Sequence, residues 1–189
     1  MKKKNRFFKS LRFRILIILV ILGIVPSVIV TRMMIGNYEK QAVAVRAGAV
    51  SSQCSILCNQ IIKENYLNDP SSEAVNGKLE MLSNVYGGRI LIVDRDFKIV
   101  KDTYHVDEGK TLVSPKIIRS FKKGEPTDYQ RKGQVIEFAV PVRSADVPQI
   151  QGAMLVTISC SEITATMMEL NYQGLLLIAV IVVLSVFLG

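Results

Sequence analysis

A polar segment at residues 102–113, DTYHVDEGKTLV, gathers several side chains that could do chemistry. Asp102, Asp107 and Glu108 supply hard carboxylate oxygens, the ligands that divalent cations such as Ca²⁺ prefer. Their spacing does not match a calcium-loop pattern, which favours a solvated loop, so these three are candidates only and no metal site is predicted. His105 is the single histidine of the chain. Because histidine ordinarily changes its charge near pH 6.5, His105 is a candidate pH sensor, which His105→Gln would test by the response to acid.

The three cysteines suggest redox chemistry. Cys54 and Cys58 stand one helical turn apart, and Cys160 follows an apolar β-rich run. In an oxidising compartment an odd count leaves one thiol over or bridges two chains. Cys54 is therefore a candidate for an intersubunit Cys54–Cys54 disulfide. Buried free thiols are the alternative, since small cysteines often pack like apolar side chains.

No catalytic constellation is visible in the sequence. A single histidine cannot form a multi-histidine metal site in one chain, and neither a Ser-His-Asp set nor a phosphate-binding loop can be built. Gly87-Gly88 is better explained as a turn than as a phosphate-binding loop. We therefore predict no catalytic residue and no cofactor, and whether the chain belongs to an enzyme stays open. The 49% hydrophobic content excludes a disordered chain.

The charge is concentrated at one end. The chain has 24 basic and 16 acidic residues, yet residues 1–14 carry seven basic side chains and no acid, while residues 35–173 hold 16 of each sign. A nucleic-acid-binding protein would place its excess charge on a folded face, so no nucleic-acid partner is expected. Here the excess precedes a hydrophobic run, as the positive-inside rule describes for a cytoplasmic N-terminus.

Two hydrophobic runs predict membrane helices. Ile15–Val30 would span about 24 Å as a helix, and the residues up to 34 extend it. No small-x-small cleavage site follows closely, which favours an uncleaved signal anchor over a cleaved signal peptide. The second run, residues 174–189, has no charge, and we expect the sequence to stop within a second transmembrane helix, a genuine C-terminal anchor being the alternative. The predicted order is a basic cytoplasmic tail at 1–14, a membrane helix at 15–34, an outer domain at 35–173 and a second membrane helix at 174–189.

The outer domain should begin with a long helix at 35–67, because no proline stands between Pro26 and Pro70 and alanine is frequent. Two apolar stripes run along it at helical spacing. One is Ile35, Tyr38, Ala42, Val45, Ala49 and Ile56; the other is Val43, Ala47, Val50, Cys54, Leu57 and Ile61. One stripe suffices for a core, so the second predicts another partner, either the rest of the domain or a second copy of the chain. A single wide buried face is the alternative.

The remaining pattern predicts an α+β domain with a sheet core at 89–159. Residues 135–142 alternate between Ile136, Phe138, Val140 and Val142 on one face and Val135, Glu137, Ala139 and Pro141 on the other, typical of an antiparallel sheet with one face covered by the long helix. Turn and cap signals set the other bounds. The expected elements are a helix capped by Asp69 with Pro70 first, reaching about Asn84; strands 89–94, 97–101, 127–131, 134–143 and 151–159; a turn at 145–148; a helix from Ser114-Pro115 to Lys123; and an exit helix from Ser161.

Four features together resemble one family. They are the basic tail with its anchor RFRILIILVILGIVPSVIV, the long helix leaving the membrane, the hairpin GGRILIVDRDFKIVKDT, and the closing strands VIEFAVPV and QGAMLVTIS. The chain resembles the extracellular sensor region of bacterial two-component histidine kinases of the single Cache type, which is PAS-like and also called PDC. The resemblance implies a five-stranded antiparallel sheet packed on the long N-terminal helix and flanked by two transmembrane helices.

The resemblance also implies a function. In the family, ligands lie between the sheet and the loop and helix after the first hairpin, which by position indicates Tyr104, His105, Tyr129, Glu137 and Thr157. The alternative is that Glu137 is simply an exposed strand residue beside a small or empty pocket.

The expected partners are the lipid bilayer of a bacterial plasma membrane, a second copy of the chain, a small-molecule or other extracellular stimulus and, through an absent kinase region, a cytoplasmic response regulator. Chemoreceptors and cyclic-dinucleotide enzymes use similar outer domains, and a non-catalytic structural or adaptor membrane protein is the rival outside this class.

Overall fold

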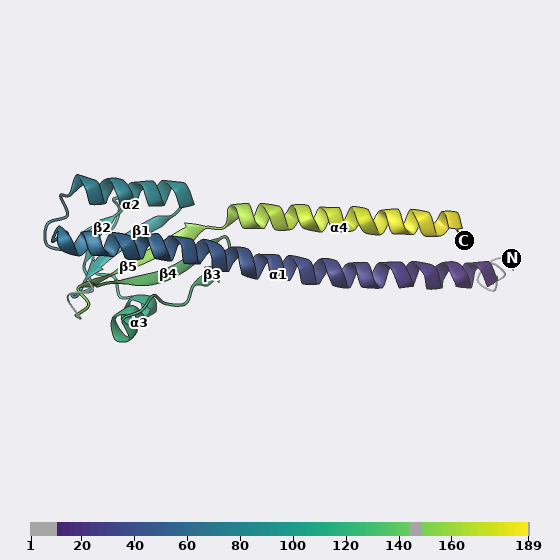
Figure 1. Cartoon of the computed structure of the whole chain (residues 1–189), viewed down its shortest axis with the longest axis horizontal. Helices are drawn as coiled ribbons and strands as arrows, with labels where there is room; N and C mark the ends of the chain where they lie inside the picture. The colour runs from purple at the N-terminus through teal and green to yellow at the C-terminus, as the bar shows by residue number, and fades with distance from the viewer. Residues whose placement is uncertain (1–10, 144–148, 189) are drawn as a thin grey trace. The chain divides into compact units, whose positions relative to one another are not determined.

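Two long helices fit the predicted membrane segments. The structure, a computed structural model, describes residues 11–143 and 149–188; the predicted tail up to residue 10 and the predicted turn at 145–148 lie outside the described residues. Helix α1 (Leu11–Lys63) and helix α4 (Ser161–Leu188) are each long and apolar enough to cross a membrane (Figure 1). None of the most apolar 18-residue window of α1, and only 11% of that of α4, is buried by protein. Bare apolar surface of this extent suggests a membrane location.

The chain forms two compact units. One runs as far as Ala42 and resumes at Ile163, and the other is Val43–Glu162. Within the first unit α1 and α4 pack closely at two glycines. A Cβ on Gly23 would lie 2.6 Å from Cγ2 of Ile181, and one on Gly174 would lie 2.6 Å from Cγ2 of Thr31. Small residues allow this close approach, as is usual between membrane helices.

The second unit contains the predicted five-stranded antiparallel sheet. Its strands lie in the order β2-β1-β5-β4-β3, and every pairing is antiparallel, so the predicted α+β fold class is confirmed. Strands β1, β5 and β4 form the centre and are linked by long, regular pairings. The strand bounds are β1 Arg89–Asp94, β2 Ile99–Asp102, β3 Gln130–Lys132, β4 Val135–Val142 and β5 Gly152–Ser159.

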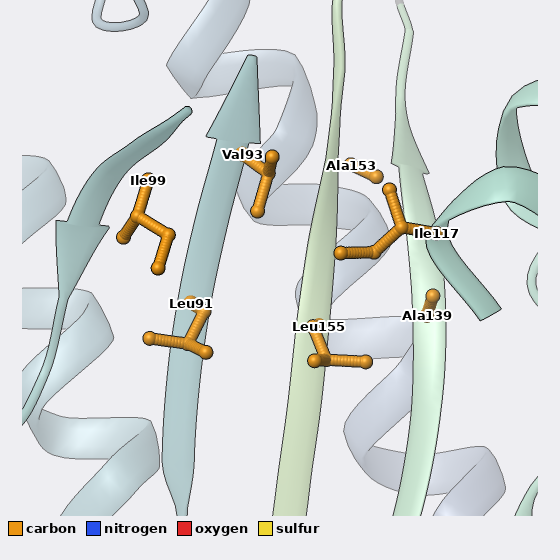
Figure 2. Close-up of a cluster of buried hydrophobic side chains, with 7 residues drawn as sticks. All are labelled: Leu91, Val93, Ile99, Ile117, Ala139, Ala153 and Leu155. Atoms are coloured by element: carbon orange, nitrogen blue, oxygen red, sulfur yellow. The ribbon is translucent and has the colours of Figure 1, made fainter. Parts of the chain in front are cut away.

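Both faces of the sheet are used. On one face Ile136, Phe138 and Val140 are buried together with the α1 stripe that contains Val43 and Ile61. The opposite face carries a second cluster, which Figure 2 shows on the side turned away from α1. Helix α3 (Pro115–Lys123) packs over β4 and β5 there. The expectation of a sheet covered on one face is therefore corrected, because an amphipathic third helix covers part of the other. The second cluster consists of Leu91, Val93, Ile99, Ile117, Ala139, Ala153 and Leu155.

The end of α1 differs from the expected residue 67. Helix α1 ends at Lys63, because Asn65 takes a left-handed backbone conformation with φ of 50°. The backbone N–H of Tyr66 donates to Ile61 O at 2.9 Å, and that of Asn65 donates to Ile62 O at 3.1 Å. This is the Schellman arrangement, and the fully buried Tyr66 supplies its apolar contact.

Helix α2 begins later than expected. It covers Glu73–Tyr86, and Ser72 is its N-cap, accepting from the backbone N–H of Val75 at 3.3 Å. The expected cap Asp69 and first residue Pro70 lie in the preceding turn instead. Helix α3 agrees with its expected range: Ser114 caps it, Pro115 is its first residue, and Gly124 ends it with φ of 66°.

The hairpin turn is longer than the sequence suggested. The second strand was expected at 97–101, but β2 starts at Ile99, because the carboxylate of Asp94 accepts from the backbone N–H groups of Asp96 and Lys98, each at 2.9 Å. Phe97 consequently stands in the turn with φ of 61°. Strand β3 is likewise shorter than the expected 127–131 and starts at Gln130.

Candidate functional site

A row of polar side chains crosses the sheet on the face covered by α3. In the strand register Glu137 of β4 pairs with Thr157 of β5, and Thr157 pairs in turn with Arg89 of β1. Paired residues in neighbouring strands project from the same face and lie within contact range of one another. Below this row the same face is apolar at Leu91 and Leu155. The row, called here the polar row (Glu137, Thr157 and Arg89), therefore borders the second hydrophobic cluster.

Arg89 is anchored by a buried carboxylate. Its Nε lies 2.9 Å from Oδ1 of Asp102 and its Nη2 lies 2.5 Å from Oδ2, a bidentate pair. The Asp102 side chain has no exposed surface, and it also accepts the backbone N–H groups of Tyr104, Val106 and Asp107 at 2.9–3.0 Å. The Arg89 guanidinium lies over the ring of Tyr104, with its Cζ 5.6 Å from the ring centroid. Five hydrogen bonds therefore close the loop after β2 around one aspartate.

The other carboxylates of this loop face protein cations. Asp107 lies 2.6 Å from Nη2 of Arg89 and 2.7 Å from Nζ of Lys110. Glu108 lies 3.0 Å from Nζ of Lys101 and 3.2 Å from Nδ1 of the exposed His105. Among the residues that the structure describes, no group of three or more acids, histidines or cysteines is arranged to hold a metal ion. The candidate ligands Asp102, Asp107 and Glu108 thus serve as ion-pair partners that order the loop.

These pairings predict how the domain responds to acid. Burial of Asp102 opposes its ionisation, but the Arg89 guanidinium and three backbone N–H groups hold the pKa of Asp102 well below its ordinary 3.8. A carboxylate whose pKa is lowered by folding contributes stability that is fully present above the unfolded pKa and is lost as the pH falls through the folded value. We expect the free energy of unfolding to fall steadily below about pH 4. Urea titrations at pH 7, 4 and 3 would measure this, and Asp102→Asn should flatten the acid limb; an equal slope in both proteins would contradict the prediction.

A cavity of about 370 Å³ lies beside the polar row, at the start of α3. Lys116 and Arg119 line it from α3, Tyr129 and Lys132 from the segment that includes β3, and Glu137 from β4. Lys132 Nζ lies 3.0 Å from Oε2 of Glu137, and Lys116 donates to the backbone carbonyl of Glu137. Three cations and the amino-terminal end of a helix therefore border a small volume that two acids also line, which leaves an excess of one positive charge. The remaining lining residues are Ser114, Pro115, Thr127, Asp128 and Gln130.

The cations of this cavity affect one another. Partial burial lowers the pKa of Lys116 from its ordinary value; the carboxylate of Glu137 opposes this change, while Lys132 and Arg119 lower the pKa further. A positive charge in such a position gains from a nearby anion, because an anion would offset both the desolvation and the repulsion. An anion is therefore favoured beside Lys116, where the five charged residues that line the cavity leave a net charge of +1.

A second hollow of about the same volume lies between the end of α1 and the β1–β2 turn. Two of the three charged side chains that line it already have partners within the chain. Asp94 caps the turn, and Nε of Arg95 donates to the carbonyl of Ile150 at 2.8 Å. The cavity at α3 is therefore the better candidate for a binding site.

The structure gathers some of the expected site residues and separates others. Glu137 and Tyr129 line the cavity at α3, and Thr157 is the cross-strand neighbour of Glu137. Tyr104 lies instead over Arg89, and His105 is exposed beside Glu108. The sequence reasoning missed the basic residues Arg89, Lys116, Arg119 and Lys132. The strict alternation of β1, which places Arg89 on the same face as Leu91 and Val93, was the one signal that could have indicated the first of them.

The cysteines lie within the domain. Cys54 and Cys160 have no exposed surface and Cys58 has 2%, and all three are free thiols. Burial raises the pKa of the Cys54 thiol to about 12, and that of Cys58 equally, with the neighbouring Cys54 adding to the effect. Thiolate is the reactive form, so these groups should react slowly in the folded protein. An intersubunit bond at Cys54 would require this side chain to leave the core.

Comparisons with known proteins give a likeness of fold. No protein-family model matches the chain, and no curated protein sequence matches it. Among solved structures, an extracellular ligand binding receptor from Desulfohalobium retbaense is similar with a TM-score of 0.54 and 16% identity, over 71% of this chain and 26% of that chain. The V. cholerae histidine kinase DctB sensor domain gives a TM-score of 0.46 and 18% identity, over 70% of this chain and 58% of that one. The chain thus spans about a quarter of the length of the first of these proteins, and the likeness to it shows a shared fold.

Proposed function

We propose that this chain is the sensory and membrane-anchoring region of a bacterial transmembrane receptor, and that the receptor is a two-component histidine kinase. The observation that carries the proposal is the cavity bordered by three cations where α3 starts over the sensor-like sheet, in a chain with two bare apolar helices. The basic residues before the first apolar run favour a cytoplasmic N-terminus, with residues 35–173 outside the plasma membrane. A kinase region beyond this chain would then act on a response regulator.

The proposed stimulus is a small anion that carries carboxylate or phosphate groups. Lys116 and Arg119 would bind its charge, and Tyr129 would supply part of the cavity wall. Such an anion would link α3 to the segment of β3, which contributes Tyr129 and Lys132 to the cavity, and β3 in turn pairs with β4. Strand β5 pairs with β4 along its whole length and ends at Ser159, directly before α4 starts at Ser161. A ligand that favours one arrangement of α3 on β4 and β5 would thereby bias the start of the exit helix between two states.

Thermal unfolding of the full chain in lipid nanodiscs tests this proposal. Phosphate, acetate, succinate and citrate are the probes, each compared with sodium chloride at equal ionic strength. An anion present at 100 times its Kd should stabilise the folded domain by about 2.7 kcal/mol. Lys116→Ala should weaken the binding of that anion by about tenfold or more, since a charge-assisted contact is lost.

Lys122→Ala is the matched control. Lys122 is on the same helix and carries the same charge, but it is exposed and does not line the cavity. Its variant should bind the anion as the wild type does. The proposed binding site is wrong if both variants lose affinity equally, or if no probe raises the melting temperature above the chloride control.

A further inference from the structure

Helix α3 carries positive charge without a single acid. It packs on the face of the sheet that is turned away from α1 (Figure 2), and it buries Ile117 and Ser120. The other sides of the helix carry four basic residues, of which only the first is partly buried. They are Lys116, Arg119, Lys122 and Lys123.

A fifth cation lies where the helix ends. A Cβ on Gly124, the residue that ends α3, would lie 3.6 Å from Nη1 of the exposed Arg143. Within the helix the basic residues follow one another at spacings of three and four residues, which places their Cβ atoms about 5–6 Å apart. The five cations therefore form a continuous line along α3, called here the basic row (Lys116, Arg119, Lys122, Lys123 and Arg143).

The exposed part of the basic row is not neutralised by the domain. Its four exposed members belong to no ion pair among the residues that the structure describes, whereas Lys101 and Lys110 each lie within 3.0 Å of a carboxylate. Residues 115–132 hold six basic side chains and two acids, although residues 35–173 as a whole hold 16 of each sign. Like charges one helical turn apart repel each other, so an extended anion would relieve a repulsion that the domain leaves in place.

We propose that the basic row binds a linear polyanion, a chain that repeats phosphate groups at short intervals, with one of its groups seated in the cavity at the start of α3. The inference rests on the proposed anion site, because Lys116 and Arg119 belong to both, and it specifies the class of ligand. A single small anion reaches only the cations of the cavity, whereas a chain that follows the helix contacts the whole row. Each further contact then forms at the high effective concentration that the connected groups create.

The make-up of the row favours phosphate over carboxylate groups. Three of its five members are lysines, whose compact ammonium group binds phosphate as a point charge. A planar carboxylate is held best by the fork of an arginine, and only Arg119 and Arg143 supply one. A phosphate presents its oxygens in several directions, so that successive lysines and arginines along a helix can each bind one group.

Titration of the full chain in phosphatidylcholine nanodiscs with orthophosphate, long-chain polyphosphate and polyglutamate tests this proposal. We expect polyphosphate to bind at least about 100-fold more tightly than orthophosphate, because several linked groups bind together. The logarithm of its affinity should fall with the logarithm of the salt concentration at a slope of about −3, since each neutralised charge contributes about −0.7 for a single-stranded nucleic acid. Polyphosphate that binds no more tightly than orthophosphate, or polyglutamate that binds as tightly as polyphosphate, would overturn the proposal.

Two double variants locate the binding. Lys122→Ala combined with Lys123→Ala leaves every residue that lines the cavity in place, and it should weaken polyphosphate binding by about tenfold or more. Orthophosphate should bind to this variant as it does to the wild type. Lys63→Ala combined with Lys78→Ala is the matched control, since it removes two exposed lysines from α1 and α2, and it should leave polyphosphate binding unchanged. Equal losses in the two double variants would contradict binding along the basic row.

The basic row and the proposed function can fail separately. If orthophosphate binds but chain length adds nothing, the small-anion site holds and the inference about the basic row is wrong. If polyphosphate binding depends on Lys122 and Lys123 while orthophosphate does not bind, the row holds and the cavity at α3 is not the anion site that the proposed function requires.

Discussion

Replacing Asp102 by alanine should lower the free energy of unfolding of the outer domain by about 3–5 kcal/mol. The substitution leaves the Arg89 guanidinium, whose side chain is only 27% exposed, without its bidentate partner. It also removes the acceptor for the backbone N–H groups of Tyr104, Val106 and Asp107. Buried donors that lose their acceptor carry the full cost of desolvation, which is why this single position should matter so much.

The natural thiols provide the readout for this experiment. Cys54, Cys58 and Cys160 are almost fully buried, so their labelling rate across a urea titration reports opening of the domain while the membrane helices stay intact. Asp107→Ala is the matched control, because Asp107 also contacts Arg89 but its side chain is 31% exposed. The free energy of unfolding should therefore fall much less in this variant than in Asp102→Ala. A loss of less than about 1 kcal/mol for Asp102→Ala would show that the loop does not depend on the buried pair.

The sheet could be predicted because its signals are local. The alternation in 135–142 and the β-rich run at 89–94 identify these segments as strands from their own residues, without knowledge of their neighbours in the sheet. Helix α3 is equally local, since Ser114, Pro115 and Gly124 mark its two ends by their own conformational preferences. The end of α1 is different: the left-handed turn at Asn65 depends on burial of Tyr66, which is a tertiary contact that no short sequence pattern contains.

The site was harder to predict than the fold, for a related reason. Glu137 and Thr157 were suggested by the family resemblance, and the strand register places them next to each other. Asp102 was read as a loop acid that could bind a cation from solution. The cation it meets is Arg89, 13 residues away in sequence, because the β1–β2 hairpin folds the loop back over the start of β1. Which charges become partners is decided by strand register, and a change of one residue would turn each side chain to the other face.

Gly88→Ala should destabilise the outer domain by about 2–4 kcal/mol, although it adds only a methyl group. A Cβ at this position would lie 2.2 Å from the carbonyl oxygen of Thr157 and 2.8 Å from Cα of Ile158. Both are backbone atoms of β5, so the clash cannot be relieved by turning a side chain, and β1 would have to move away from β5. Because Arg89 follows directly, the same movement should displace it from Thr157 and weaken the polar row.

Gly77→Ala separates this steric effect from the general effect of replacing a glycine. Gly77 is an exposed residue within α2, and a Cβ there would meet nothing within 4 Å. Since alanine favours the helix, this variant should gain about 0.5–1 kcal/mol. Opposite signs for the two variants, measured by thiol labelling in urea, are the expected result. If Gly88→Ala were as stable as the wild type, β1 and β5 could not approach as closely as described, and the pairing of Arg89 with Thr157 that forms one end of the polar row would have to be abandoned.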